Sequence, residues 1–327
     1  MEVRASRKLI AERAGVSKTT VTRVLSGFSS VSDETKKRVL SVIDELGYTQ
    51  NKLAGNLGRN QNCNFVAMLV PDMTNYYYLE MFDRMVSSLE NLDYTVSIYK
   101  VSQGNFEQMM DKIIQNRVSA IINLAFIPIS EAYLKKVESA NIKIVHPGIH
   151  TDPVRIKVDY RAAMQQAFES LRSRGCRQFR FLCGASRSFL ADGRIQTFLS
   201  LMAETGLEGE PNVVWGNYPE VSALNEGYLI MRQLLEEIPD LDAVFCLNDM
   251  MAIGAIKAVR ESGRKAGRDV SVIGFDNIRL GEFSIPSLST IDSNIELEAQ
   301  LYVDYVLGKK VGEAEIKSEY ISRLSTR

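Results

Sequence analysis

Histidine and cysteine are scarce in this chain of 327 residues, which contains two histidines and four cysteines. The histidines, His146 and His150, lie in the run HPGIH, whereas a zinc site needs three or four ligands. The cysteines form no Cys-x-x-Cys pair, which favours buried, reduced thiols; they are Cys63, Cys176, Cys183 and Cys246. We therefore expect neither a metal site nor a disulfide framework.

Catalytic motifs and long apolar runs are absent as well. The sequence has no G-x-x-x-x-G-K-[ST], H-E-x-x-H or G-x-S-x-G motif, and we find no assembled acid–base pair or nucleophile. We therefore expect no enzymatic activity and no cofactor. The N-terminal run MEVRASRKLI lacks the apolar core of a signal peptide, and no run approaches the ~18 apolar residues of a membrane span. These observations predict a cytoplasmic protein without a membrane partner.

The net charge of -1 conceals an uneven distribution of charge along the chain. Residues 1–60 carry a net charge of +5, and the rest of the chain carries -6. The composition, with 45% hydrophobic and 24% charged residues, is otherwise typical of globular proteins, and the length favours two or three domains. A small basic head on an acidic body favours a polyanionic partner for the head.

The basic head has the pattern of three short helices. Residues 7–14 (RKLIAERA) have helical apolar spacing and end at Gly15, which can adopt the positive φ of a sharp turn. Ser17 is a suitable N-cap for the next helix, KTTVTRVLSG, and Ser32 for a third. The apolar stripes of the second and third helices are Val21, Val24 and Leu25, and Val39, Val42, Ile43 and Leu46. The pattern predicts a helix-turn-helix, whose second helix enters the DNA major groove.

The other face of the second helix has side chains suited to DNA. Lys18 and Arg23 can reach guanine or phosphate oxygens, and Thr19 and Thr22 can bind base edges, phosphates or a thymine methyl group. The alternative is a solvated polar face on a small helical domain. Helix geometry alone does not decide between these interpretations.

From residue 64 onward, apolar strand-like runs alternate with amphipathic helical stretches. The runs are residues 65–70, 95–99, 120–124, 142–145, 179–183, 213–215, 243–247 and 270–275. Such alternation predicts an α/β fold with parallel sheets covered on both faces. Two sets of four runs suggest two doubly wound lobes, whose ligands bind beyond the carboxyl ends of the strands.

Polar and aromatic residues follow several of these strands. The candidate ligand-binding residues are Asp72, Asn248, Asp249 and Asp276, which can bind hydroxyl groups, and Tyr76, Tyr77, Tyr78 and Tyr218, which can stack on a flat or pyranose face. An aspartate after a buried strand can instead cap the next helix, and we favour that role for Asp249. The irregular run NIRLGEFSIP after Asp276 favours a ligand there. Consecutive tyrosines at a helix start cannot all point in one direction.

Two runs in the head, AERAGVSKTTVTRVLSG and VSDETKKRVLSVIDELGY, resemble the DNA-binding head of the LacI/GalR family of transcriptional regulators. Thr22 stands where that family usually has serine, and Ser26 where it usually has asparagine. The runs VAMLVPDMTNYYYLEMF, AVFCLNDMMAIGAIKAVRESG, VSVIGFDN and ISRLSTR extend the resemblance over almost the whole chain. It implies a helix-turn-helix head joined to an effector domain of the type I periplasmic-binding-protein-like fold.

The resemblance also implies roles for individual residues. The positions that match effector contacts of the family are Tyr77, Tyr78, Arg194, Tyr218, Asn248 and Asp276. The guanidinium of Arg194 suits a bidentate hold on hydroxyls, a carboxylate or a phosphate, although it can instead pair with an acid across the lobe interface. Gly148 and Ser293 differ from residues that relatives use for effector binding, so the specificity is expected to be the chain's own.

The segment QNKLAGNLGRNQN aligns with the hinge helix of the family, where Asn51, Ala54 and Leu57 match. Leu57 would wedge between base pairs in the minor groove, as some architectural proteins do, or pack against its dimer mate. Gly55 replaces an arginine, and each glycine inside a helix costs ~1 kcal/mol relative to alanine. We expect a hinge that is disordered without DNA and only conditionally helical on it.

Together these inferences predict a homodimeric repressor that binds palindromic double-stranded operator DNA and responds to a small-molecule effector. The effector is expected to be a sugar or sugar derivative; a purine or nucleoside, or a sugar phosphate acting as corepressor, is the alternative. A sugar-binding protein without a DNA role and an enzyme with an incidental basic head are the rivals. Three parts are expected along the chain. Residues 1–49 form the helix-turn-helix, with Ser17, Lys18, Thr19, Thr22 and Arg23 at DNA, and residues 50–62 form the hinge. Residues 63–327 are divided into an N-lobe (about 63–160 and 292–314) and a C-lobe (about 161–291 and 315–327).

Overall fold

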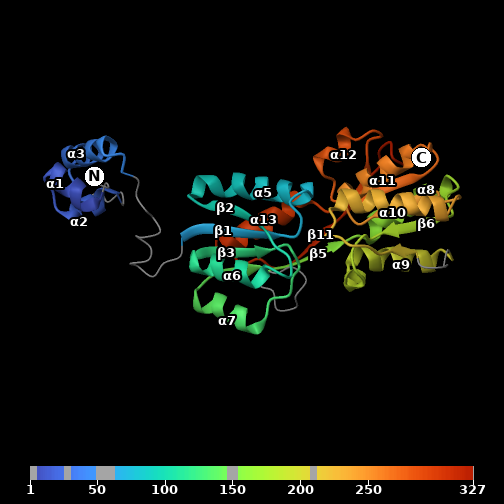
Figure 1. Cartoon of the computed structure of the whole chain (residues 1–327), viewed down its shortest axis with the longest axis horizontal. Helices are drawn as coiled ribbons and strands as arrows, with labels where there is room; N and C mark the ends of the chain where they lie inside the picture. Colours follow the sequence, from blue (N-terminus) through green and yellow to red (C-terminus); the bar gives the residue numbers. More distant parts are fainter. Residues whose placement is uncertain (1–5, 26–30, 49–62, 146–153, 207–211, 327) are drawn as a thin grey trace. The chain divides into compact units, whose positions relative to one another are not determined.

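The computed structural model describes residues 6–25, 31–48, 63–145, 154–206 and 212–326. The chain forms two compact units, Met1–Cys63 and Asn64–Arg327 (Figure 1). The predicted hinge residues Asn51, Ala54 and Leu57 lie outside the described residues, as do the two histidines.

The first unit contains the three predicted helices, α1 (Arg7–Ala14), α2 (Lys18–Leu25) and α3 (Asp33–Glu45). Each of the three contributes a fully buried side chain to one small core: Ile10, Val21 and Val39. The apolar stripes read from the sequence therefore face one another, and the polar faces remain outside.

The second unit begins with a four-stranded sheet in the order β2-β1-β3-β4, which together with its helices we call the first lobe. Its strands are β1 (Cys63–Val70), β2 (Thr95–Lys100), β3 (Val118–Asn123) and β4 (Lys143–Val145), and its helices are α5 (Tyr76–Leu89), η1 (Glu90–Leu92), α6 (Phe106–Gln115), α7 (Glu131–Ser139) and α13 (Ile295–Val306). Successive side chains of β1 enter two different cores, Met68 on one face and Leu69 on the other. In Figure 1, α5 and α13 cover one face of this sheet, while α6 and α7 cover the other.

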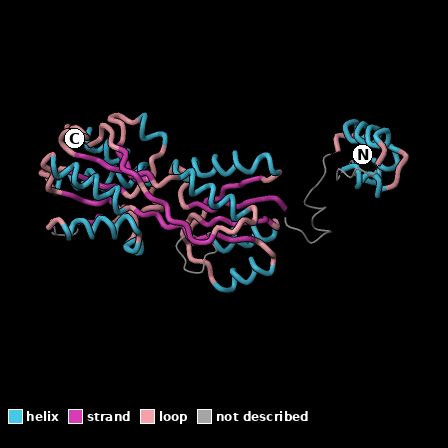
Figure 2. Tube along the Cα trace, turned by 180° about the vertical axis from the view of Figure 1, so that it is seen from behind, coloured by secondary structure: helices cyan, strands magenta, loops and turns pink. Residues whose placement is uncertain are grey.

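The second lobe has a six-stranded sheet in the order β12-β10-β9-β8-β6-β7. Its strands are β6 (Phe179–Leu182), β7 (Val213–Val214), β8 (Ala243–Cys246), β9 (Ser271–Phe275), β10 (Ser289–Asp292) and β12 (Glu319–Ile321), and its helices are α8 (Arg161–Ser173), η2 (Arg187–Ala191), α9 (Gly193–Glu204), α10 (Ala223–Glu237), α11 (Asp249–Glu261) and α12 (Arg279–Phe283). All pairs are parallel except β10 with β12. Figure 2 shows helices on both sides of the strands, which confirms the predicted doubly wound α/β class.

The expectation of two sets of four strands is wrong in detail. Beyond the eight expected runs, β10 and β12 extend the second sheet, and β5 (Val154–Asp159) pairs in parallel with β11 (Gly312–Lys317). In VRIKVD and GEAEIK, charged residues alternate with other residues, and EYI is only three residues long. None of the three contains a long continuous apolar run. Strands at a sheet edge or in a two-stranded ribbon bury less surface, so their sequences lack the apolar run of a central strand. The strand β10 (STID) is buried, but it is short and contains three polar residues.

Candidate functional site

The helix α2 presents a polar face outside the core of the first unit. Lys18, Thr19 and Arg23 are exposed, and Val21 on the opposite side is fully buried. The hydroxyl of Thr22 donates a hydrogen bond of 3.0 Å to the carbonyl oxygen of Lys18. The exposed face therefore combines two cations with two threonines, and no acidic residue occurs between positions 17 and 25.

The turn before α2 determines where this face begins. Gly15 has φ of 63°, in the left-handed region that favours glycine. The side-chain oxygen of Ser17 accepts a hydrogen bond of 3.1 Å from the amide of Thr20, as expected of an N-cap. An ion pair of 2.7 Å between Arg13 and Glu45 joins α1 to α3. The helix that carries the polar face is thus held by its turn and by the third helix.

Asp72 follows β1 and joins the two lobes. Its Oδ1 accepts hydrogen bonds from the Thr74 amide (2.8 Å) and hydroxyl (2.6 Å), and its Oδ2 accepts one from the Ala223 amide (3.3 Å) at the start of α10. Both oxygens of this buried carboxylate are therefore occupied by protein donors. This geometry supports a role in connecting the lobes more than the predicted role in binding hydroxyl groups.

The tyrosines at the start of α5 point in different directions, as expected. Asn75 caps the helix by accepting a hydrogen bond of 3.1 Å from the amide of Tyr77. Tyr76 is exposed, Tyr78 is buried against the Tyr77 ring in an edge-to-face contact, and the Tyr77 hydroxyl donates a hydrogen bond of 2.7 Å to Glu298. Tyr77 and Tyr78 both lie within electrostatic range of Asp276 in the second lobe.

Arg194 is held in place by neighbours in the second lobe. Its guanidinium binds both carboxylate oxygens of Asp192, at 2.9 and 2.7 Å, and donates a third hydrogen bond of 2.8 Å to the Leu247 carbonyl oxygen. Burial by itself would raise the pKa of Asp192, but the adjacent guanidinium lowers it below its usual value. The alternative to effector contact was a pair across the lobe interface, but Arg194 pairs with an acid of its own lobe, the residue before its own helix.

Asn248 and Asp249 follow β8 and have structural partners. Asn248 is the N-cap of α11, accepting a hydrogen bond of 2.9 Å from the Met251 amide, so the expectation that Asp249 caps this helix is wrong. The fully buried Asp249 instead accepts hydrogen bonds from the Thr290 hydroxyl (2.6 Å) and the Ile278 amide (2.9 Å). Burial raises its pKa well above the usual value. Asp249 therefore fixes the loop that follows β9.

Asp276, at the end of β9, lies at the centre of the charged groups of this site. Its φ is 102°, which is unusual for a residue with a side chain. No described residue donates a hydrogen bond to its buried carboxylate. Burial raises the pKa of Asp276 to about 7; Arg194 acts to lower it, and Glu298 and Asp192 act to raise it. A buried, strained and unpartnered carboxylate is a candidate ligand-binding group.

Two more polar side chains near the ends of strands lack partners. Among the described residues, the buried hydroxyls of Tyr218 and Ser293 form no hydrogen bond of normal geometry. Tyr218 lies close to the side chains of Asn75 and Tyr78 from the first lobe, and burial raises its pKa to about 12. Buried polar groups usually have a partner, so these hydroxyls mark places where a ligand can supply one.

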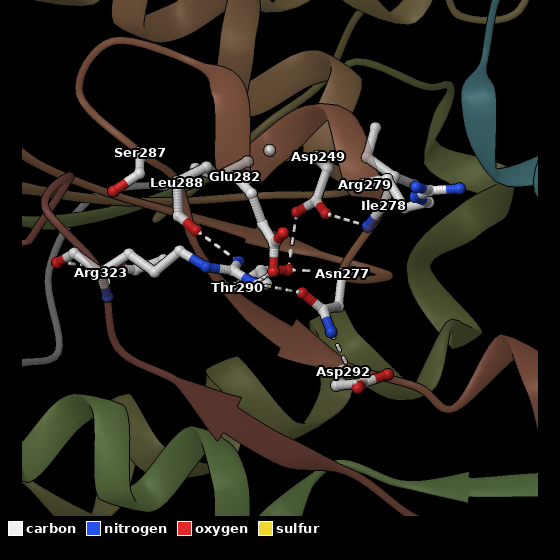
Figure 3. A network of polar contacts seen from close by, with 12 residues as sticks. Asp249, Asn277, Ile278, Arg279, Glu282, Ser287, Leu288, Thr290, Asp292 and Arg323 are labelled. Atoms are coloured by element: carbon white, nitrogen blue, oxygen red, sulfur yellow. Dashed lines mark hydrogen bonds and ion pairs between the residues drawn. The ribbon is translucent and has the colours of Figure 1, made fainter.

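A hydrogen-bond network holds the loop that presents Asp276 (Figure 3). The guanidinium of Arg323 donates to the Leu288 carbonyl oxygen (2.8 Å), to Asn277 Oδ1 (2.9 Å) and to Glu282 (3.0 Å). Asn277 has φ of 56° and donates to Asp292 at 3.0 Å. Two successive residues with positive φ are thus stabilised by a residue near the end of the chain.

Four residues of the site were not expected from the sequence, namely Tyr160, Asp192, Glu298 and Arg323; Tyr160 lies within electrostatic range of Arg194, Asp192, Asp276 and Glu298. Glu298 had a recognisable signal, because it lies three residues after Ile295 on the apolar face of α13 (IELEAQLYVDYV). Asp192 immediately precedes a helix and is a recognisable N-cap. No local pattern indicates that Tyr160 and Arg323 reach this site.

Two other expectations concern metal and membrane. In the described ranges, no group of three or more histidine, cysteine, aspartate or glutamate side chains is arranged to hold a metal ion. None of the helices described is long and apolar enough to cross a membrane.

Comparisons with known proteins agree with this arrangement. Two family models match the chain: bacterial regulatory proteins of the lacI family over residues 8–51, and a periplasmic binding protein-like domain over residues 168–327. The HTH-type transcriptional repressor PurR of Pectobacterium carotovorum subsp. carotovorum is 31% identical over 88% of this chain and 85% of its own length. The HTH-type transcriptional repressor CytR of Escherichia coli K12 is 28% identical over 100% and 97%. A crystal structure of the lac repressor dimer bound to operator and the anti-inducer ONPF has the same fold, with a TM-score of 0.81 and 24% identity over 99% of both chains.

Proposed function

Because the chain belongs to the lacI family of bacterial regulatory proteins, we propose that it is a transcriptional repressor whose operator affinity is controlled by a small metabolite. The observation that carries this proposal is the helix-turn-helix of Met1–Cys63, which matches the family model and presents an exposed basic face. Related proteins of similar length are named as transcriptional repressors. Two rival functions are disfavoured. The names of the relatives count against an enzyme, and the match of residues 8–51 to the lacI family model counts against a sugar-binding protein without a DNA role.

In this proposal the face of α2 reads the operator. Lys18 and Arg23 contact guanine edges or phosphates, Thr19 and Thr22 contact base edges or thymine methyl groups, and Ser17 sets the start of the helix. Binding as a homodimer matches two heads to a palindromic site. The proposed hinge contacts, Asn51, Ala54 and Leu57, lie outside the described residues.

The effector is proposed to bind between the lobes of Asn64–Arg327, against residues that follow the strands. The hydroxyls of Tyr218 and Ser293 form no hydrogen bond of normal geometry, no described residue donates one to Asp276, and Tyr77, Tyr78 and Arg194 lie within electrostatic range of Asp276. Asn248 and Asp72 shape the site through their caps and lobe contacts. A sugar or sugar derivative suits this mixture of rings and acceptors; a purine or nucleoside, or a sugar phosphate, is the alternative.

Direct contacts between lobes provide the means by which an effector can act on the head. Asp72 binds the Ala223 amide at 3.3 Å, and Glu80 of α5 binds the Arg279 amide of α12 at 2.7 Å. A ligand that prefers one arrangement of the lobes shifts the equilibrium between arrangements, and its effect on operator affinity must be reciprocal.

DNA binding is tested on a duplex selected from a random pool with the full-length protein. We expect Arg23→Ala to weaken binding to the selected duplex roughly 5- to 150-fold, the range of one lost base contact, and wild-type binding to fall steeply with salt. Arg172→Ala removes the same charge from an exposed position on α8 and is expected to bind as the wild type does. Equal wild-type affinity for selected and scrambled duplexes would contradict the proposal.

A thermal-shift screen over sugars, nucleosides, purines and sugar phosphates tests the effector site. We expect Asp276→Ala and Arg194→Ala to reduce the shift produced by the best ligand, because ligands that bind only the folded state raise its stability. An unchanged shift in both variants would place the effector elsewhere.

A further inference from the structure

The buried face of α13 carries an acid that faces the proposed effector site from the first lobe. Glu298 is 9% exposed, between Ile295 and Tyr302 on the same buried face. Its Oε2 accepts a hydrogen bond of 2.7 Å from Tyr77, and its Oε1 accepts one of 2.8 Å from Tyr302. Two hydroxyl donors stabilise the carboxylate form, although burial still raises the pKa of Glu298. A carboxylate can accept further hydrogen bonds, so its capacity is not exhausted.

Glu298 is one of two buried acids that approach the site from opposite lobes. Asp276 belongs to the second lobe, and the two carboxylates repel one another through the low-dielectric interior. No described residue donates a hydrogen bond to Asp276. A cation bound between these acids would offset part of their negative charge and would favour the approach of the lobes.

The guanidinium of Arg194, which lies near these acids, already forms an ion pair within the protein. Both oxygens of Asp192 bind the Arg194 guanidinium, at 2.9 and 2.7 Å. Asp192, Asp276, Glu298 and Arg194 together therefore carry a net charge of -2 when all four are ionised. An anionic ligand would add to this excess, whereas a cationic ligand would reduce it.

Four tyrosines lie within electrostatic range of Asp276, namely Tyr77, Tyr78, Tyr160 and Tyr218. Tyr78 and Tyr218 are buried, and Tyr77 and Tyr160 are partly buried. The face of a tyrosine ring attracts cations, and aromatic rings combined with carboxylates are a common means of binding charged nitrogen. The rings and the acids thus favour the same chemistry by separate physical effects.

We propose that Glu298 determines the specificity of the effector site, selecting ligands that carry a protonated amine or similar cationic nitrogen and rejecting phosphorylated or carboxylated ones. This inference rests on the proposed function and narrows it, because it disfavours the sugar phosphate among the candidate effectors. Arg194 then contacts hydroxyl groups with its remaining N–H donors while Asp192 balances its charge.

The test compares matched ligands on the full-length protein at pH 7.5. The probes are three sets built on the same scaffolds: neutral hexoses and nucleosides, their amino-substituted counterparts, and their phosphates. Dissociation constants are measured by calorimetry for every probe that shifts the melting temperature. We expect the amino member of the binding scaffold to bind at least tenfold more tightly than the neutral member, and the phosphate to bind most weakly.

The variant Glu298→Gln keeps the size of the side chain and removes its charge. In this variant the amino ligand is expected to bind less than threefold more tightly than the neutral ligand. Glu296→Gln is the matched control, because Glu296 is exposed on the same helix and pairs with Arg84 at 2.9 Å; its preference should equal that of the wild type. Should Glu298→Gln not fold, Glu298→Met is measured in its place, because it also removes the charge and suits the buried face between Ile295 and Tyr302; the same loss of preference is expected.

The possible outcomes separate this inference from the function on which it rests. Tightest binding of a phosphate, or an unchanged preference in Glu298→Gln, overturns the role of Glu298 and leaves metabolite control standing. An unchanged preference in Glu298→Met overturns the role of Glu298 in the same way. If no probe shifts the melting temperature while selected DNA still binds, metabolite control fails and this inference fails with it.

Discussion

At the scale of single residues, the environment of Asp276 decides its chemistry. An aspartate after a buried strand is ordinary, but here the backbone has φ of 102° and the carboxylate is buried without a described donor. Arg323 binds the side chain of Asn277 and Asp249 binds the amide of Ile278, so both hold the two residues that follow Asp276. The strain and the burial are thus maintained by the surrounding network, as is common at binding sites.

The raised pKa of Asp276 predicts a particular dependence of stability on pH. Its value in the folded protein, about 7, lies above the ordinary 3.8, so between these values the folded state holds a proton that the unfolded state has lost. The free energy of unfolding therefore falls as the pH rises from about 4 to 7. Asp276→Asn removes this contribution, which amounts to at most about 4 kcal/mol at 1.36 kcal/mol per pH unit.

Urea unfolding at pH 5, 6, 7 and 8 measures this difference. We expect Asp276→Asn to gain stability relative to the wild type as the pH rises from 5 to 8. Arg194, Glu298 and Asp192 remain in both proteins, so the comparison isolates Asp276 from those groups, apart from their coupling to it. Asp83→Asn changes an exposed aspartate on α5, and its free energy of unfolding should change with pH as that of the wild type does. Parallel curves for Asp276→Asn as well would show that the carboxylate is not buried as described.

At the scale of elements, glycines allow two helices of the second lobe to approach closely. A Cβ atom added to Gly254 of α11 would overlap the carbonyl oxygen of Leu224 in α10 and lie 2.9 Å from the Tyr228 amide nitrogen. A Cβ atom added to Gly227 would likewise overlap the Met251 carbonyl oxygen. Backbone atoms cannot move as a flexible side chain can, so the helices would have to separate.

We therefore expect Gly254→Ala to lower the free energy of unfolding of the second unit by about 3 kcal/mol, the upper part of the usual range for overpacking. Gly104→Ala is the control, since an added Cβ atom there meets only the Ser102 hydroxyl oxygen at 4.0 Å. Urea denaturation of both variants measures the difference. Equal stability of the two variants would mean that the contact between α10 and α11 relaxes without cost.

At the scale of the whole molecule, the chain has two compact units with separate cores. The first unit is small, and its core contains side chains such as Ile10, Val21 and Val39. Small domains bury a smaller fraction of their surface than large ones and are only marginally stable. The two units are therefore expected to unfold in separate transitions.

Differential scanning calorimetry tests this independence with one variant in each unit. Val21→Ala, at a fully buried position of the head, should remove about 2 kcal/mol from the smaller transition only. Gly254→Ala should lower the larger transition only, and an effector should raise the larger transition only. A single transition that both substitutions shift together would show that the units unfold cooperatively.

Local sequence patterns were sufficient to predict the helices of the head and the α/β class of the body. Gly15 and Ser17 are local signals, and their roles in the turn and the cap are confirmed because both depend on neighbouring backbone. Apolar periodicity placed Val21 in the core for a similar reason, since it records which side of a helix avoids water. The ribbon of β5 and β11 was missed because its strands leave no continuous apolar run.

The contacts that complete the candidate site join residues far apart in the sequence and form only in the folded protein. Tyr77 meets Glu298 across 221 positions of sequence, and Arg323 supports Asn277 from the far end of the chain. Asn248 rather than Asp249 became the helix cap, and the Asp249 carboxylate turned instead toward Thr290. Sequence indicates which groups follow a strand, but their partners and pKa values depend on burial and on residues that only folding brings near.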